Sequence, residues 1–312
     1  IPSVTIAGPG FAEQVAVTAV NNGVSTARVA FYPGAFTSHS EHQLVENTRN
    51  ILWPQIKKAL TDPLRPEERL TADRFPAADA RQTVYGGTFD DINRFIDEMN
   101  WGDGLPVVPP TMARINEFLK FGGLEYDAPI AVLPIAHRQT LAIHVAACGV
   151  MAGCKPEYMP ILVALTKGLG SPEFRRTLSS THAWNPFCWL NGPLARQLHI
   201  DCGQGEVSES ANMAIGRFMN IALKNLSGYY IKQDRMGTFG YLMPWCLVED
   251  EEACARVGWT PYHVSQGFST DDNTVTVASA LMWGNNMAPS TDNPQKITEL
   301  MAWDITQRCQ FA

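Results

Sequence analysis

The chain has 312 residues, and its 24 Lys and Arg against 31 Asp and Glu give a formal net charge of −7. This balance argues against a general nucleic-acid binder, which would carry a basic patch or stripe. An apolar content of 45% with 18% charged residues excludes disorder over most of the length. The chain contains no apolar run of about 18 residues, so no membrane span is predicted, and no signal peptide is visible. We therefore expect a cytoplasmic protein.

The first sixty residues alternate strand and helix. Residues 3–7 and 28–32 are short apolar runs with β-branched residues, which predicts buried strands. Helical spacing of apolar residues predicts helices over 11–22 and 40–60. The order implies parallel strands joined by a helical crossover, as in half of a flavodoxin-like or Rossmann-like domain. Because two parallel strands do not complete a buried sheet, we expect further strands from a partner chain or from a segment outside these residues.

A polar connector follows. Residues 61–82 are rich in Pro, Arg, Asp and Glu, and Thr88 is a good N-cap for a helix over residues 89–99. Two glycines and three prolines in residues 101–111 specify a rigid, shaped loop that ends at a second N-cap, Thr111. The predicted organisation has three parts: a partial α/β domain (1–65), a connector with one helix (66–100) and a larger mixed α/β domain (101–312).

The larger part mixes helices and strands. Strands are predicted at 131–133, 241–248 and 274–283, and helices at 139–151, 156–169, 207–226 and 297–309. The helix over 207–226 has the clearest period, with an apolar stripe at Val207, Ala211, Ala214, Ile215, Phe218, Met219, Ala222 and Leu226. The predicted fold class is therefore α/β with two lobes.

Metal and nucleotide motifs are weak. Gly8-Pro9-Gly10 sits between a strand and a helix, but Glu13 stands where a dinucleotide fingerprint needs a third glycine, so a plain turn is the alternative to a ligand loop. The chain has no Cys-x-x-Cys and no His-Glu-x-x-His, so no metal ligand is assigned.

The seven scattered cysteines do not form a disulfide scaffold, and reduced, mostly buried thiols are expected. Cys154 is the candidate nucleophile. It precedes Lys155 and a helix predicted to begin at Pro156, and both features lower a thiol pKa. The alternative is a buried structural cysteine, because cysteine is among the most buried residue types.

A polar pocket is the second candidate feature. Turns at Asn191, Gly203 and Gly205 would supply hydrogen-bond donors, and Asn212 and Arg217 project from the long helix away from its apolar stripe. Arg217 would hold a substrate carboxylate in a two-pronged contact. The alternative is a solvated helix face.

Four stretches carry a resemblance: residues 102–111, residues 151–160, Asn191-Gly192-Pro193, and Ala211-Asn212 with Ile215-Gly216-Arg217. Together they resemble the UGSC-motif family, named for a selenocysteine-or-cysteine, Gly, Ser, Cys sequence. The naming motif lies upstream of a strand like residues 3–7, and this chain has no positions that match it. The resemblance implies an enzyme with thiol or selenol chemistry whose reactive chalcogen comes from an upstream segment or from a partner.

Two classes of function are therefore expected. The first is an enzyme acting on a small polar or anionic molecule by thiol- or selenol-type redox or addition chemistry, with a metal-assisted hydratase, hydrolase or lyase as its alternative. The second is a non-catalytic subunit of a hetero-oligomer that binds a catalytic partner chain. The predicted catalytic residues are Cys154, Arg217 and Asn212, and the predicted substrate-binding residues are Asp103, Gly104, Asn191, Gly203 and Gly205. No cofactor is assigned.

Overall fold

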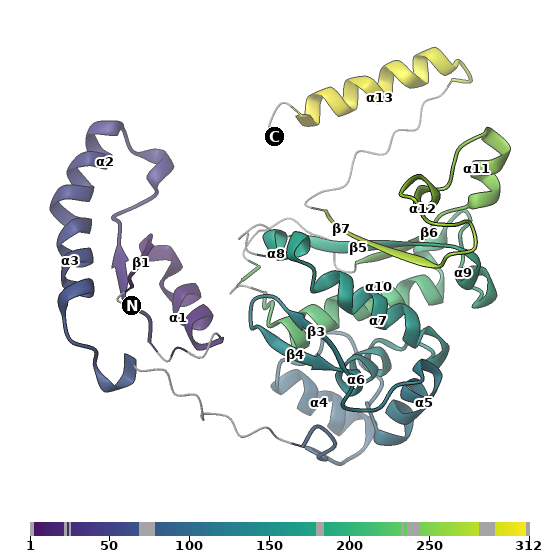
Figure 1. Cartoon of the computed structure of the whole chain (residues 1–312), viewed down its shortest axis with the longest axis horizontal. Coiled ribbons are helices and arrows are strands. Elements are labelled where there is room, and N and C mark those ends of the chain that lie inside the picture. The colour runs from purple at the N-terminus through teal and green to yellow at the C-terminus, as the bar shows by residue number, and fades with distance from the viewer. Residues whose placement is uncertain are drawn as a thin grey trace.

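The computed structural model describes residues 3–21, 24, 26–68, 79–178, 184–231, 234–235, 244–280 and 291–309. These residues form the mixed α/β fold predicted from the sequence (Figure 1). None of the helices described is both long and apolar enough to cross a membrane.

The strands are β1 (Thr5–Ala7), β2 (Val29–Phe31), β3 (Pro129–Leu133), β4 (Arg138–Leu141), β5 (Asn185–Asn191), β6 (Trp245–Val248) and β7 (Thr274–Ala280). The α-helices are α1 (Ala12–Asn21), α2 (Glu41–Asn47), α3 (Trp53–Thr61), α4 (Phe89–Glu98), α5 (Met112–Gly122), α6 (Ala142–Ala152), α7 (Met159–Leu169), α8 (Pro172–Leu178), α9 (Pro193–Gln197), α10 (Ser210–Ala222), α11 (Glu251–Val257), α12 (Tyr262–Ser265) and α13 (Pro294–Cys309). Short 3-10 helices are η1 (Pro9–Phe11), η2 (Phe36–Ser38), η4 (Pro66–Glu68), η5 (Pro156–Tyr158) and η6 (Glu206–Ser208), and π-helices are η3 (Thr48–Leu52) and η7 (Leu223–Ser227).

The N-terminal elements follow the predicted β-α-β-α order. β1 and β2 pair in parallel, with Ile6 opposite Ala30, and they form a two-stranded sheet among the described residues. Ala30, Tyr32 and Leu52 make a small buried cluster that is separate from the main core. A capping box at Ser40 begins the second helical stretch, which runs through α2, η3 and α3.

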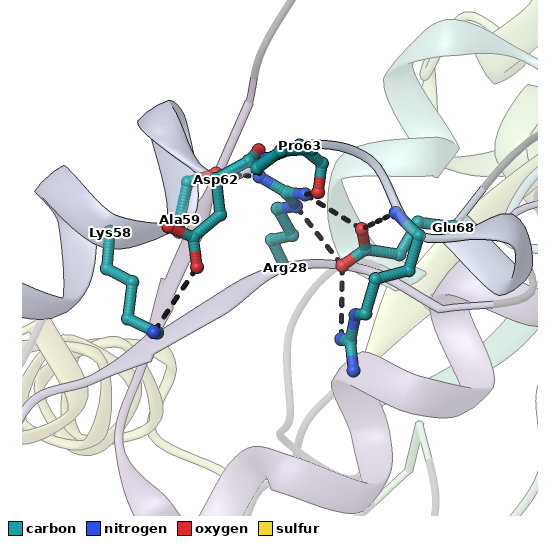
Figure 2. A network of polar contacts seen from close by, with 7 residues as sticks. Arg28, Lys58, Ala59, Asp62, Pro63 and Glu68 are labelled. Carbon is teal, nitrogen blue, oxygen red and sulfur yellow. Dashed lines mark hydrogen bonds and ion pairs between the residues drawn. The ribbon is translucent and has the colours of Figure 1, made fainter.

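The segment after α3 folds back onto β2 through Arg28 (Figure 2). The Arg28 guanidinium donates to both carboxylate oxygens of Glu68, at 3.1 and 2.8 Å, and also to the backbone oxygens of Ala59, Asp62 and Pro63. The hydrogen bonds from Arg28, together with those from Arg65, lower the pKa of Glu68 to about 2. The first residues of the predicted connector therefore pack on the N-terminal elements, while its part at 69–78 lies outside the described residues.

The main core consists of a three-stranded sheet and layered helices. β5 is central, parallel to β6 and antiparallel to β7. α7 and α10 pack against this sheet, and α6 packs against α7 and α10 (Figure 1). Nine of the eleven α6 residues are buried, as expected of a helix that is apolar all round and enclosed by other elements.

Three sequence predictions need correction here. The sequence pattern misses the central strand β5, in which the half-buried Phe187 and Trp189 alternate with the buried Cys188 and Leu190 after a proline. Residues 139–141, predicted as the start of a helix, belong to strand β4, where they pair with β3. Val207 of the predicted apolar stripe lies in η6 and is exposed.

The α10 stripe is otherwise confirmed, and one glycine sets how closely the helix approaches the sheet. A Cβ on Gly216 would lie 2.1 Å from the backbone oxygen of Pro244. Because only glycine permits this approach, α10 sits directly on β6.

Candidate functional site

Asp103 and Arg217 form a buried ion pair. Arg217 Nε lies 2.8 Å from Asp103 Oδ2, and Arg217 Nη2 lies 2.8 Å from Asp103 Oδ1. Nη2 also donates to the backbone oxygens of Leu105 and Pro106. The Arg217 and Asp103 side chains are only 14% and 5% exposed, so Arg217 does not lie on a solvated face. The guanidinium group that was predicted to hold a substrate carboxylate in a two-pronged contact holds Asp103 instead. Hydrogen bonds and charge from Arg217 outweigh burial and lower the pKa of Asp103.

A cavity of about 220 Å³ lies beside this pair. Two predicted substrate-binding residues, Asp103 and Gly104, line it, and none of Cys154, Asn191 or Arg217 does. The other lining residues come from the end of α10, from η7 and from the segment that follows: Asn220, Leu223, Lys224, Tyr229, Ile231 and Arg235. π-Helices such as η7 are rare and are frequent at functional sites.

Two cationic side chains face the cavity. Lys224 Nζ donates to Asn100 Oδ1 at 2.6 Å and to the backbone oxygen of Gly102 at 2.5 Å. Arg235 donates to Asn185 Oδ1 at the start of β5. Burial lowers the pKa of both groups, which means that the cavity wall is partly desolvated. Burial also raises the pKa of Tyr229 to about 12, so its phenol stays protonated at neutral pH.

Cys154 does not have the predicted low pKa. Its side chain is buried, its thiol donates to the Ala214 backbone oxygen at 3.3 Å, and burial raises its pKa. The argument from helix position is wrong because α7 begins only at Met159, after the 3-10 turn η5, and because desolvation outweighs the nearby positive charge. The expectation of buried, free thiols is confirmed for Cys148, Cys154, Cys188, Cys246 and Cys254, and Cys202 is half-buried.

Asn212 is buried within the fold. Its amide donates to the Asp201 and Cys246 backbone oxygens and accepts from the Asp201 amide, so it ties the Gly203–Gly205 turn to β6. Gly203 donates to Asp201 Oδ1, and Gly205 has a φ of 84° at the start of η6. The interpretation of Asn212 as part of a solvated face is therefore wrong.

Asn191 belongs to a second polar cluster, at the end of β5. Its Nδ2 donates to Glu249 Oε2 at 2.5 Å and to Glu251 Oε1 at 3.2 Å. His263, also in this cluster, is 1% exposed, and its Nδ1 lies 3.7 Å from Glu251 Oε1. The predicted pocket of Cys154, Asn191, Asn212 and Arg217 is thus divided among separate sets of partners. The catalytic and binding roles of these residues stay predictions.

The sequence patterns do not identify the charged residues of the cavity beside Asp103 or those of the polar cluster at the end of β5. Lys224 and Arg235 lack a motif, and Lys224 faces the cavity through the irregular η7 turn. Glu249 and Glu251 had a usable signal, since an acidic run directly follows the predicted strand ending at residue 248. His263 is a single histidine in a short helix, and no sequence pattern marks it as part of a site.

No family model, no curated protein and no solved structure matches the chain. The resemblance to the UGSC-motif family therefore stays a prediction, and the site must be interpreted from its own chemistry.

Proposed function

We propose that the chain binds a small anionic molecule, a carboxylate or a phosphate, in the cavity beside Asp103 and acts on it as an enzyme. The observation that carries this proposal is the pair of partly desolvated cations, Lys224 and Arg235, in one small cavity. An anion that binds there would replace the water that these charges have lost.

The donors needed for an anion are present. An ammonium group has three N–H donors, and the described contacts of Lys224 use two of them. A guanidinium has five, and the described contact of Arg235 uses one nitrogen. Among the described residues of the lining, Asp103 is the only carboxylate, and it is already neutralised by Arg217, so it does not oppose an anion.

This proposal does not use a cysteine thiolate of the chain as the reacting group. Burial raises the pKa of Cys154, which disfavours thiolate attack at neutral pH. In the cavity, the Tyr229 phenol, which stays protonated at neutral pH, is suited to donate a hydrogen bond to a bound oxygen. Redox or addition chemistry by a thiol or selenol would then need a chalcogen from another segment or chain.

Calorimetric titration with inorganic phosphate and, separately, with succinate tests the proposal. We expect one equivalent of at least one probe to bind, more weakly at high salt. Lys224→Gln and Arg235→Gln should each weaken binding by about 10- to 100-fold, because a charged hydrogen bond contributes about 1.5–3 kcal/mol. Lys120→Gln, which alters an exposed lysine of α5, is the matched control. Wild-type protein that binds neither probe, or equal binding by wild type and Lys224→Gln, would contradict the proposal.

One observation favours a partner chain as well. Gln55 bonds both backbone groups of Phe31, at 3.0 and 3.1 Å, and so closes the outer edge of β2. The ladder joins Thr5 and Ala7 to β2, which leaves the outer edge of β1, at Ile6, without a strand among the described residues. Ile6 is 47% exposed. We propose that a strand of a partner chain pairs with β1 there.

Ile6→Pro separates the two edges of β1, because it removes an N–H directed away from β2. We expect native mass spectrometry to find the wild-type chain bound to a second chain in native material, and the variant to be unbound yet folded. A slowly exchanging Ile6 amide in the isolated chain would contradict this proposal, since the edge would then already be covered.

A further inference from the structure

Two parallel strands end beside an acidic segment. β5 ends at Asn191 and β6 ends at Val248, and Glu249 and Glu251 follow directly. In α/β sheets, the carboxyl ends of parallel strands are where ligands bind. The cavity of the proposed function lies near Asn185, at the opposite end of β5, which at about 3.3 Å per residue is roughly 20 Å away. The cluster is therefore independent of that function.

Among the described residues, no cationic side chain holds the two carboxylates together. Both accept from the single amide of Asn191, and Glu249 Oε2 and Glu251 Oε1 also accept from the backbone N–H groups of Tyr262 and Gly192, each at 2.8 Å. In the described part of the chain, neither forms an ion pair with Lys or Arg. Arg196 and Arg256 pair instead with Glu252 and Asp250, the neighbours of these carboxylates in sequence. Two adjacent negative charges without a counterion favour a cation.

His263 supplies the independent observation. Its ring is 1% exposed, and neither ring nitrogen has a hydrogen-bond partner among the described residues. The 3.7 Å from Nδ1 to Glu251 Oε1 is too long for a hydrogen bond. Asn191 Oδ1 is likewise buried without a partner. Buried polar atoms without partners are rare and costly, so an imidazole aimed at two carboxylates indicates a ligand that bonds to all three.

We infer that Glu249, Glu251 and His263 bind one divalent cation of the transition series, with Zn²⁺ as the reference ion. One ligand atom from each residue lies within 4.8 Å of the others, close to the separation of ligands on one ion with bonds of about 2.0–2.2 Å. Two carboxylates balance a 2+ charge. The imidazole favours zinc, copper, iron or nickel over calcium and magnesium, which prefer oxygen ligands alone. Three protein ligands leave a coordination position for water or another molecule.

Metal titration of the full, EDTA-stripped chain tests this inference. Calorimetry with Zn²⁺ and with Co²⁺ should show one equivalent bound. Glu251→Gln and His263→Gln should weaken binding at least about tenfold, because even the loss of a contact that supports a ligand typically costs about 10- to 100-fold in metal affinity. Glu252→Gln is the matched control, because Glu252 is next in the same helix and lies outside the cluster. The Co²⁺ adduct should lack a thiolate-to-cobalt charge-transfer band.

Three results would overturn the inference: no binding of either ion by the wild type at about 1 mM, equal affinity of wild type and Glu251→Gln, or a thiolate band, which would assign the ion to a cysteine such as Cys254. If His263→Gln does not fold, Glu251→Gln decides the matter, since a glutamine oxygen can still accept from the Gly192 amide. Phosphate and succinate binding in the cavity should be unchanged in Glu251→Gln, which separates failure here from failure of the proposed function.

Discussion

Arg217→Met would break the buried pair that fixes the loop at Asp103. The substitution removes two charge-assisted bonds of 2.8 Å and leaves the Asp103 carboxylate, only 5% exposed, without its counterion. Loss of one partner of a buried pair costs about 3–5 kcal/mol, and the partial exposure of Arg217 places the expected loss near the lower value. With a urea m-value of about 3 kcal/mol/M for a chain of this size, the midpoint should fall by about 1 M.

Urea unfolding followed by circular dichroism and by tryptophan fluorescence measures this loss, since Trp101 lies at the start of the loop. Arg94→Met is the control, because the exposed pair of Arg94 with Asp91 contributes only about 0–1 kcal/mol. Asp103→Asn with Arg217→Met should cost less than the sum of the single changes. Equal stability of Arg217→Met and wild type would refute the reasoning. Because Arg217 depresses the pKa of Asp103 in the fold, this stabilisation is present above about pH 4 and is lost as the pH falls further.

The remaining predictions concern thiols, packing and acid. Iodoacetamide at pH 8 should modify Cys202, which is half-buried, before the buried Cys154, whose pKa is raised; rapid modification of Cys154 would restore it as a nucleophile. Gly216→Ala should destabilise the fold by about 1–3 kcal/mol, because the new methyl group overpacks the contact with Pro244. Gly10→Ala is the control, since no neighbouring element lies within 4 Å of the new methyl group, and it should change stability by less than about 0.5 kcal/mol. Equal melting curves for the two variants would contradict the packing argument. Because the Glu68 pKa falls from 4.5 to about 2 in the fold, its contribution is present above about pH 4.5 and disappears toward pH 2, so acid unfolding of Glu68→Gln should lack this component.

Local features of the fold could be predicted because neighbours along the chain create them. Thr88 and Thr111 cap the helices that they precede, each accepting from the amide three residues later. The apolar period predicts the buried face of α10. Val207, which lies before the helix and is exposed, is the exception. The β-α-β order of the first residues likewise indicates a parallel pair, which is observed. The caps and the stripe depend on residues three or four apart, a distance over which sequence spacing and side-chain contact coincide. The parallel pair depends only on the order of consecutive elements.

Contacts between distant segments were decided by tertiary packing alone. Arg217 meets Asp103 across 114 residues and Arg235 meets Asn185 across 50, and neither spacing contains a local signal. Asn191 meets Glu251 across 60 residues because β5 and β6 pair in parallel and end at the same edge of the sheet. Sequence identifies a side chain that can carry charge or accept a proton. Packing decides which of these groups are removed from water and therefore which partner, protein or ligand, each of them needs.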